Sequence, residues 1–281
     1  MQGDTRTTVE RWAGCAVADA AELDGGEVGT VYRADLADGR RVVVKTAETD
    51  LTTEARMLQH LAEVGGLAVP EVSYAVPELL VLEFVSGDGE LTPAVERDLA
   101  ERLAALHDSR ADQFGFPFDT LTGRFRQPNP WVDDWPEFFG EHRLGHAAER
   151  AVAEGVLPDP TAERVDAVVA DLPTLLDHDP EPCLIHGDVW RENLLLADGS
   201  VRAFLDPACY YADPEVELAY VDWTETGGDA FLERYRELVD LPAGVAERRP
   251  VYRLYPLLTH VRHFGDDYLE PLRATLSGLG Y

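Results

Sequence analysis

The chain has 281 residues, 45% of them hydrophobic, so it is long and apolar enough to fold around a proper core in one large domain or two modest ones. It carries 53 acidic against 24 basic residues, a formal net charge of −29. Such a surface repels the phosphates of nucleic acids and of anionic membranes, so we expect neither a nucleic-acid partner nor a membrane partner.

The acid excess is accompanied by a near absence of lysine, because Lys45 is the only lysine in the chain. A strongly GC-biased genome explains the missing lysines. Adaptation to high salt better explains the net charge, since molar salt shortens the Debye length to roughly 3 Å and screens self-repulsion. We favour a halophilic protein, which predicts loss of fold or activity in dilute buffer.

The cysteines and the N-terminus bear on the compartment. The spacing of Cys15, Cys183 and Cys209 matches no metal-binding pattern, so we expect reduced thiols. The first residues, MQGDTRTTVE, have no apolar signal core, and no apolar run approaches the length of a membrane span. We therefore expect a cytoplasmic protein. No sequence feature reports the oligomeric state, and a monomer is our expectation.

The first part of the chain has the pattern of short strands with one helix. Residues 28–46 predict a β-hairpin, because two β-rich runs are joined by an Ala-Asp-Gly triplet at 37–39. A helix and two further strands are expected at 51–64, 72–75 and 79–84. The stretch Ser-Gly-Asp-Gly at 86–89 then has the composition of a hinge.

After this hinge the pattern is mainly helical, and one strand-rich island at 183–205 interrupts it. Thr92 and Pro93 form a helix start signal. Helices are predicted at 93–107, 134–153, 161–176, 214–223, 229–239 and 245–264. We therefore predict an α+β protein with a small N-terminal lobe at 1–86, made of an antiparallel sheet plus one helix, and a larger, mainly helical C-terminal lobe at 87–281.

Lys45 ends the apolar run Val42–Val44 in the predicted hairpin. In the next helix Glu54 shares a stripe with Leu51 and Leu58, so its carboxylate faces a buried surface and needs a partner. The lysine nine residues upstream is the natural partner, and a strand lysine held by a helix glutamate is how kinases orient the phosphates of ATP. A surface lysine at a strand end is the alternative.

Two weaker features point to the same nucleotide. The glycines Gly25, Gly26 and Gly29 precede the hairpin, where backbone N–H groups approach phosphates, but they lack the full G-x-G-x-x-G spacing and most such turns bind nothing. The strand that contains Glu83 ends at Val85, where the lobes join, so this terminal backbone is a candidate partner for the adenine edge. An ordinary core strand is the alternative.

The segment CLIHGDVWRENLLLADGSVRAFLDP, residues 183–207, carries the strongest signal. An apolar strand ends in His-Gly-Asp at 186–188, Asn193 follows five residues after Asp188, and Asp206 closes a hairpin. Asp188 can accept the proton of a substrate hydroxyl, while Asn193 and Asp206 offer the hard oxygens that Mg²⁺ prefers. A catalytically silent loop explains this ordered set less well.

Several nearby side chains are candidates for binding an acceptor. Trp131, Trp135 and Trp190 can stack on a sugar or on a cationic amine, although most aromatic residues in such helices belong to the core. Arg191 can reach a phosphate or a sugar, or narrow the acceptor pocket. Glu217, in the first turn of a helix where the dipole favours acids, is a candidate brace for the backbone of the Asp188 loop.

Together these residues resemble the fructosamine (ketosamine) kinases, within the protein-kinase-like and aminoglycoside phosphotransferase superfamily. The superfamily is indicated by Lys45, Glu54, the triplet at 186–188, Asn193 and Asp206. The subfamily is indicated by Trp190 two residues after Asp188, by Asp-Pro-Ala at 206–208, by Tyr211 with 215–219, and by the aromatic block at 114–144. Arg191-Glu192 and Ala212-Asp213 depart from the family pattern, which makes the acceptor less certain.

The resemblance implies a bilobal protein-kinase-like fold that uses ATP and Mg²⁺. It implies transfer of the γ-phosphate to a sugar hydroxyl, the 3-hydroxyl, of a fructosamine or ribulosamine, a step of protein deglycation repair. The partner would then be a small molecule or a glycated amine. Two alternatives stay open: another small-molecule kinase, acting on an aminoglycoside or choline, and a nucleotide-binding pseudokinase that serves as a binding module.

Overall fold

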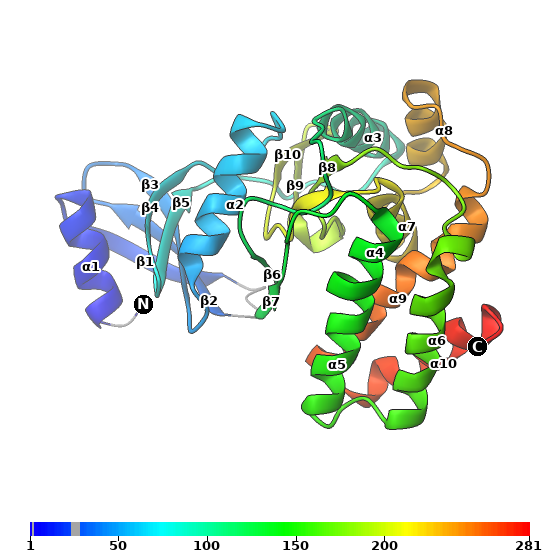
Figure 1. Ribbon diagram of the computed structural model, residues 1–281. Coiled ribbons are helices and arrows are strands. Elements are labelled where there is room, and N and C mark those ends of the chain that lie inside the picture. The colour runs from blue at the N-terminus through cyan, green and yellow to red at the C-terminus, as the bar shows by residue number, and fades with distance from the viewer. Residues whose placement is uncertain (2, 24–28) are drawn as a thin grey trace.

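The computed structural model describes residues 1, 3–23 and 29–281. Gly25 and Gly26, which we predicted to contact ATP, lie outside the described residues. The elements form a small β-rich lobe and a larger helical lobe (Figure 1), so the α+β prediction is confirmed.

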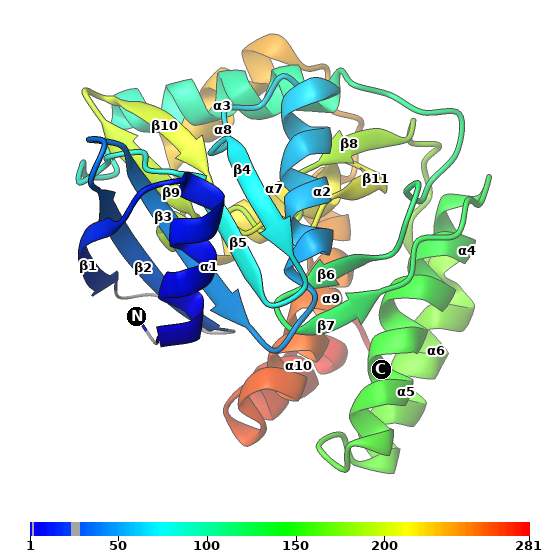
Figure 2. The same ribbon diagram turned by 90° about the vertical axis from the view of Figure 1, so that its left-hand side faces the viewer.

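The N-terminal lobe is a five-stranded antiparallel sheet with one helix on each face (Figure 2). Side chains alternate between the faces of a strand. Along β5, Leu79–Glu83, residues Leu79 and Val81 pack with Val9 of the first helix, whereas Leu80 and Leu82 pack with the second helix. The strand order is β1-β2-β3-β5-β4, and the elements are α1 Gly3–Ala13, β1 Val17–Leu23, β2 Gly29–Leu36, β3 Arg41–Ala47, α2 Leu51–Glu63, β4 Val72–Val76 and β5 Leu79–Glu83.

The predicted hairpin is confirmed as β2 and β3, and the helix predicted at 51–64 is confirmed as α2. Asp50 caps α2, because its side chain accepts a hydrogen bond from Thr52 N. The first helix, α1, was not predicted.

The described C-terminal lobe consists of helices around a large core, with three short two-stranded sheets, β9–β10, β8–β11 and β6–β7, on the side of the N-terminal lobe (Figure 1). Its helices are α3 Pro93–His107, α4 Trp135–Phe139, α5 His146–Ala153, α6 Asp159–Leu175, α7 Glu215–Trp223, α8 Asp229–Leu238, α9 Val245–Phe264 and α10 Asp266–Gly278. Its strands are β6 Thr120–Thr122, β7 Phe125–Gln127, β8 Cys183–Ile185, β9 Leu194–Ala197, β10 Ser200–Phe204 and β11 Tyr210–Ala212.

The helix predicted at 134–153 is helical throughout but widens in its middle. A π-helical segment, Gly140–Gly145, joins α4 to α5. A Cβ on Gly145 would lie 3.0 Å from the carbonyl oxygen of Gly140, so glycine suits this wide turn. The hairpin β6–β7 and the strand β11 were not predicted, because three-residue strands are too short to show a periodicity. The helix α10 was not predicted either.

The segment between β5 and α3, where we place the boundary between the lobes, packs closely on β9. Gly89 N donates to Leu196 O at 2.7 Å. A Cβ on Gly87 would lie 2.8 Å from Leu196 N, and a Cβ on Gly89 would lie 2.8 Å from Leu196 O. Only glycine allows this approach of the two backbones.

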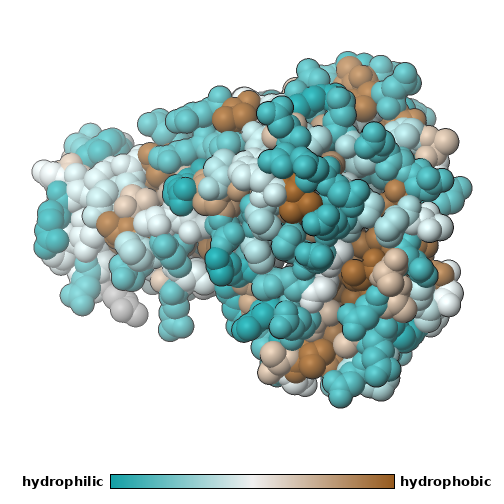
Figure 3. Space-filling view, in the orientation of Figure 1, coloured by the Kyte–Doolittle hydropathy of each residue, from teal (hydrophilic) through white to brown (hydrophobic). Residues whose placement is uncertain are grey.

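No helix in the described part of the chain is long and apolar enough to cross a membrane. On the face shown in Figure 3, hydrophilic residues cover most of the surface and apolar patches are small. That pattern fits the large excess of acidic residues.

Candidate active site

Lys45 lies between two carboxylates, one from each lobe. Its Nζ is 2.8 Å from Glu54 Oε2 in α2 and 2.6 Å from Asp206 Oδ1, which follows β10. The Lys45 and Glu54 side chains are only 11% and 10% exposed, whereas that of Asp206 is 47% exposed. The predicted pair of lysine and glutamate is therefore present, and the lysine also reaches the C-terminal lobe.

The electrostatics of this triad follow from burial and charge. Burial raises the pKa of Glu54 to about 7, although the Lys45 ammonium opposes that effect. Burial also acts to lower the pKa of Lys45, but the two carboxylates outweigh it and the net pKa is raised. For Asp206, desolvation acts to raise the pKa, but the charge and hydrogen bond of Lys45 outweigh that effect, so the net pKa is lowered. Lys45 and Asp206 are both charged at neutral pH.

The backbone turn before Asp188 is held from below by one buried carboxylate. Glu217 Oε2 accepts from His186 N at 3.1 Å, and Glu217 Oε1 accepts from Gly187 N at 2.7 Å. His107 holds Glu217 in turn, with its Nε2 3.1 Å from Oε2. The predicted brace is thus confirmed, and it fixes the direction in which the loop presents Asp188.

Gly187 makes this turn possible. Its φ is 84°, in the left-handed region, and a Cβ at this position would lie 2.4 Å from Ala208 O. Asp206 also has a positive φ, 49°, which aspartate tolerates better than most residues. A positive φ is unfavourable for a residue with a side chain, and such conformations concentrate at functional sites; Asp206 adopts one here.

Asp188 is hydrogen-bonded at both carboxylate oxygens. Asn193 Nδ2 donates to Asp188 Oδ2 at 2.9 Å and to Asp188 O at 3.0 Å. Tyr220, on α7, donates its hydroxyl to Asp188 Oδ1 at 2.7 Å. Asn193 and Tyr220 are therefore both partners of the Asp188 carboxylate, and the sequence predicted neither contact.

A cleft of about 750 Å³ opens beside Asp188 in the C-terminal lobe. It runs from the Asp188 loop past the tip of the β6–β7 hairpin to the junction of α9 and α10. The residues that line it are Thr122, Gly123, Gly187, Asp188, Trp190, Tyr210, Val216, Glu217, Tyr220, Trp223, Thr224, Tyr255, Pro256, Thr259, His260, His263, Phe264, Asp267 and Tyr268.

The charge in the cleft is negative. Among these described lining residues there are three acids, Asp188, Glu217 and Asp267, and no lysine or arginine. Burial lowers the pKa of His260, and it lowers the pKa of His263 to about 4, so both rings are neutral at pH 7. The walls are aromatic: the ring centroids of Trp223 and His260 are 5.2 Å apart, and those of His260 and Tyr268 are 4.7 Å apart.

The four residues predicted to bind the acceptor lie in different surroundings. Trp190 lines the cleft. Trp131 is 43% exposed and lies near Tyr211 rather than among the described lining residues. Trp135 is only 2% exposed and its Nε1 donates to a buried tyrosine hydroxyl, so it belongs to the core. Arg191 donates to Leu194 O and Gly89 O, and therefore holds the interlobe segment.

Three further residues were predicted to contact ATP and lie within the described part of the chain, namely Gly29, Glu83 and Val85. Gly29 begins β2, opposite Ala47. Glu83 ends β5, is exposed, and pairs with Val42, while Val85 follows it in the segment between the lobes. Their roles toward ATP stay a prediction.

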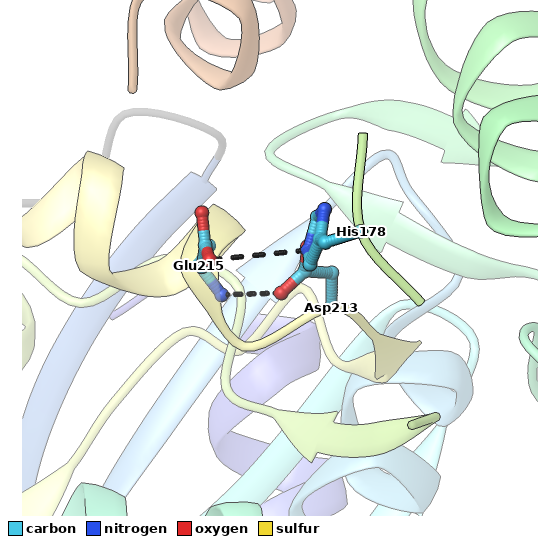
Figure 4. Close-up of side chains that lie close together, drawn as sticks. All are labelled: His178, Asp213 and Glu215. Atoms are coloured by element: carbon cyan, nitrogen blue, oxygen red, sulfur yellow. Dashed lines mark hydrogen bonds and ion pairs between the residues drawn. The ribbon is translucent and has the colours of Figure 1, made fainter. Parts of the chain in front are cut away.

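A second cluster, His178, Asp213 and Glu215, brings three possible metal ligands together (Figure 4). His178 Nε2 is 2.6 Å from Asp213 Oδ2 and 3.8 Å from Glu215 Oε1. Arg248 already binds both oxygens of Glu215, at 2.8 and 2.5 Å, and the Tyr252 hydroxyl donates to Asp213. We interpret the cluster as an ion-pair network that fastens α7 to α9.

Comparison with known proteins identifies the family of the chain. The family model for fructosamine kinase matches residues 4–279. The probable ketoamine kinase YniA of Escherichia coli (strain K12) is 34% identical over 269 residues, which cover 92% of this chain and 91% of YniA. The probable ketoamine kinase VP1481 of Vibrio parahaemolyticus is 31% identical over 271 residues, covering 93% and 92%.

Comparison with solved structures points to the same family. A crystal structure from Thermobifida fusca YX-ER1, assigned as a fructosamine-3-kinase, has a TM-score of 0.86 at 30% identity and covers 97% of this chain and 96% of that one. The aminoglycoside phosphotransferase APH(4)-Ia, in a ternary complex with AMP-PNP and hygromycin B, has a TM-score of 0.68 at 21% identity and covers 99% and 97%, which shows a shared fold. The chain belongs to the fructosamine kinase family of phosphotransferases, with a bilobal kinase-like fold.

Proposed function

We propose that this protein transfers the γ-phosphate of ATP to a sugar hydroxyl of a ketoamine. The observation that carries the proposal is a convergence of the two lobes. Lys45 and Glu54 of the N-terminal lobe meet Asp206 of the C-terminal lobe, and Asp188 opens onto the cleft from the same strand-rich segment that Asp206 ends.

In this proposal Lys45 exchanges Asp206 for the phosphates of ATP. Its ammonium is a compact charge on a flexible stem, so it can turn while Glu54 keeps hold of it. Asp206 is half exposed and charged, and is thus free to take a cation once Lys45 leaves.

The residues present fit a magnesium ion. Asn193 uses its amide nitrogen on Asp188, so its amide oxygen, on the other arm of the same group, points away from Asp188. That oxygen and the Asp206 carboxylate are the hard donors that Mg²⁺ prefers. When bound there, the ion would neutralise charge on the transferred phosphate.

Asp188 would act as the base. The acceptor hydroxyl gives its proton to the Asp188 carboxylate as its oxygen forms a bond to the γ-phosphorus, and the bond from that phosphorus to the β–γ bridging oxygen breaks to release ADP. Glu217 holds the loop backbone so that the carboxylate faces the cleft.

The cleft suits a sugar joined to an amine. Aromatic walls stack on sugar rings and attract cations, and the acids supply negative charge without a lysine or arginine among the described lining residues. Trp190 is the tryptophan that we propose touches the acceptor. Phosphorylation of the 3-hydroxyl would destabilise the ketoamine and release the amine, a deglycation step.

A panel of acceptors tests the proposal. The protein is incubated with Mg·ATP and, separately, fructosyl-lysine, ribulosyl-lysine, choline and kanamycin, and the products are identified by mass spectrometry. We expect phosphate on a ketosamine, followed by release of free lysine. Phosphate on kanamycin or choline alone would show that the acceptor is an aminoglycoside or choline and not a ketosamine. ATP binding without transfer to any acceptor would indicate a pseudokinase.

We also propose that the protein works in a reducing, salt-rich cytoplasm. The cysteines of the described chain are free thiols. The net charge of −29 makes the acidic side chains repel one another, and only high salt screens that repulsion. The expected result is a lower thermal unfolding midpoint after dialysis from molar salt into dilute buffer, and an unchanged midpoint would remove the salt argument.

A further inference from the structure

Tyr220 lies one helical turn after Glu217, so α7 presents both side chains to the Asp188 loop from the same face. Glu217 binds the backbone of the loop, whereas the Tyr220 hydroxyl donates to the side chain itself, at 2.7 Å from Asp188 Oδ1. The same helix therefore sets both the path of the loop and the direction of its carboxylate.

The carboxylate is held from two elements. Asn193, in the turn before β9, donates to Oδ2, and Tyr220, on α7, donates to Oδ1. A carboxylate oxygen has more than one lone pair, so both oxygens can accept a further bond from an acceptor hydroxyl. With two donors in place, rotation about the Cβ–Cγ bond of Asp188 is restricted.

The ring of Tyr220 is itself kept in position. It is half-buried in the wall of the cleft, and its centroid is 5.9 Å from that of Trp223 on the same helix. A phenol also has only two side-chain torsions to order, so it makes a stiffer donor than a longer polar chain. The hydroxyl is thus presented to Asp188 by a rigid support.

We propose that Tyr220 is a positioning residue, which orients the Asp188 carboxylate for proton transfer without binding the acceptor. The inference rests on the proposed role of Asp188 as the base. A displacement of about 1 Å at a reacting group is enough to cost a large part of a catalytic rate, so loss of the contact from Tyr220 should slow the transfer itself rather than substrate binding.

The test compares Tyr220→Phe with Tyr281→Phe. Tyr281 also donates its hydroxyl to a carboxylate, Asp171 Oδ2 at 2.7 Å, and neither residue is among those that line the cleft. For Tyr220→Phe we expect kcat to fall about tenfold, as for loss of one hydrogen bond to a charged group, with KM for ATP and for the ketosamine within twofold of wild type. Tyr281→Phe should leave kcat, KM for ATP and KM for the ketosamine unchanged.

Two kinetic results would overturn the proposal: an unchanged kcat, or a raised KM for the acceptor at an unchanged kcat, which would make Tyr220 a binding residue. Thermal unfolding confirms that the variant is folded. Should it not fold, Tyr220→Met, which also lacks a donor, is taken through the same measurements.

A crystal structure separates this inference from the proposed function. If wild type phosphorylates no ketosamine, the proposed function fails, but the orientation of Asp188 can still be compared between wild type and Tyr220→Phe. We expect the Asp188 carboxylate to turn in the variant while Asn193 stays in place. An unchanged orientation would show that Tyr220 does not position it.

Discussion

The proposed nucleotide side and the proposed acceptor side of the site hold their charges in different ways. On the nucleotide side the Lys45 ammonium is matched by Glu54 and Asp206, within 2.8 Å of each. On the acceptor side the carboxylates of Asp188 and Asp267 face an aromatic cleft whose described lining has no lysine or arginine. Under the proposed function, Lys45 would have to exchange a carboxylate partner to bind anionic phosphates, whereas the negative cleft would accept a neutral or cationic molecule without such an exchange.

The largest effect is expected where the two sides meet. Asp188→Asn removes the proton acceptor but keeps a similar shape, so we expect kcat to fall by roughly 10²- to 10⁴-fold. Binding of Mg·ATP, measured by calorimetry, should be kept. Asp198→Asn, in the exposed turn of the same segment, is the matched control. Full activity of Asp188→Asn would remove Asp188 from the mechanism.

The nucleotide side is tested by removing its cation. Lys45→Met leaves Glu54 and Asp206 without their shared partner, and we expect kcat/KM for ATP to fall on the order of 100-fold, as for other transition-state charge contacts. Arg41→Met removes an exposed cation from the same strand, paired with Asp35, and should have no such effect. Equal losses in both variants would mean that general surface charge, not the Lys45 contact, steers ATP.

The acceptor side is tested by removing a charge at the far end of the cleft. Asp267→Asn should raise KM for a cationic ketosamine by roughly two- to fivefold, the scale of an exposed charge contact. KM for an uncharged acceptor such as fructose should not change. Glu270→Gln, on the same helix but outside the lining residues, is the control. A KM that rises equally for charged and uncharged acceptors would contradict the charge argument.

The smallest expected effect is on stability and concerns His178, which is paired with Asp213 and lies near Glu215. Burial acts to lower the pKa of His178, but the hydrogen bond and charge of Asp213 outweigh it, so the net pKa is raised. A raised folded-state pKa gives stability that is present below the unfolded value, near 6.5, and is lost as pH rises through the folded value. His178→Gln should therefore lower the unfolding midpoint more at pH 6 than at pH 8. An equal loss at both pH values would show that His178 contributes by packing alone.

The sequence predicted the nucleotide side better because regular elements determine which way its side chains face. Lys45 is on a strand of period 2 and Glu54 is on a helix whose apolar stripe is clear, so their contact follows from two local patterns.

The acceptor cleft could not be read in the same way. Its walls come from α7, α9 and α10 and from the short hairpin β6–β7, which lies about 90 residues before α7 in the sequence. Nothing local shows that His260 faces the cleft, and Tyr220 is marked only by its place one turn after Glu217. Trp135 was wrongly predicted to bind the acceptor, because aromatic neighbours on α4 and α9 bury it in the core.

A crystal structure with Mg²⁺, a non-hydrolysable ATP analogue and a ketosamine tests the central claim most directly. The account predicts that Lys45 leaves Asp206 for the phosphates while it keeps Glu54, and that the sugar hydroxyl lies within hydrogen-bonding distance of Asp188. A nucleotide bound elsewhere, or a Lys45 that stays on Asp206 with the nucleotide in place, would contradict it.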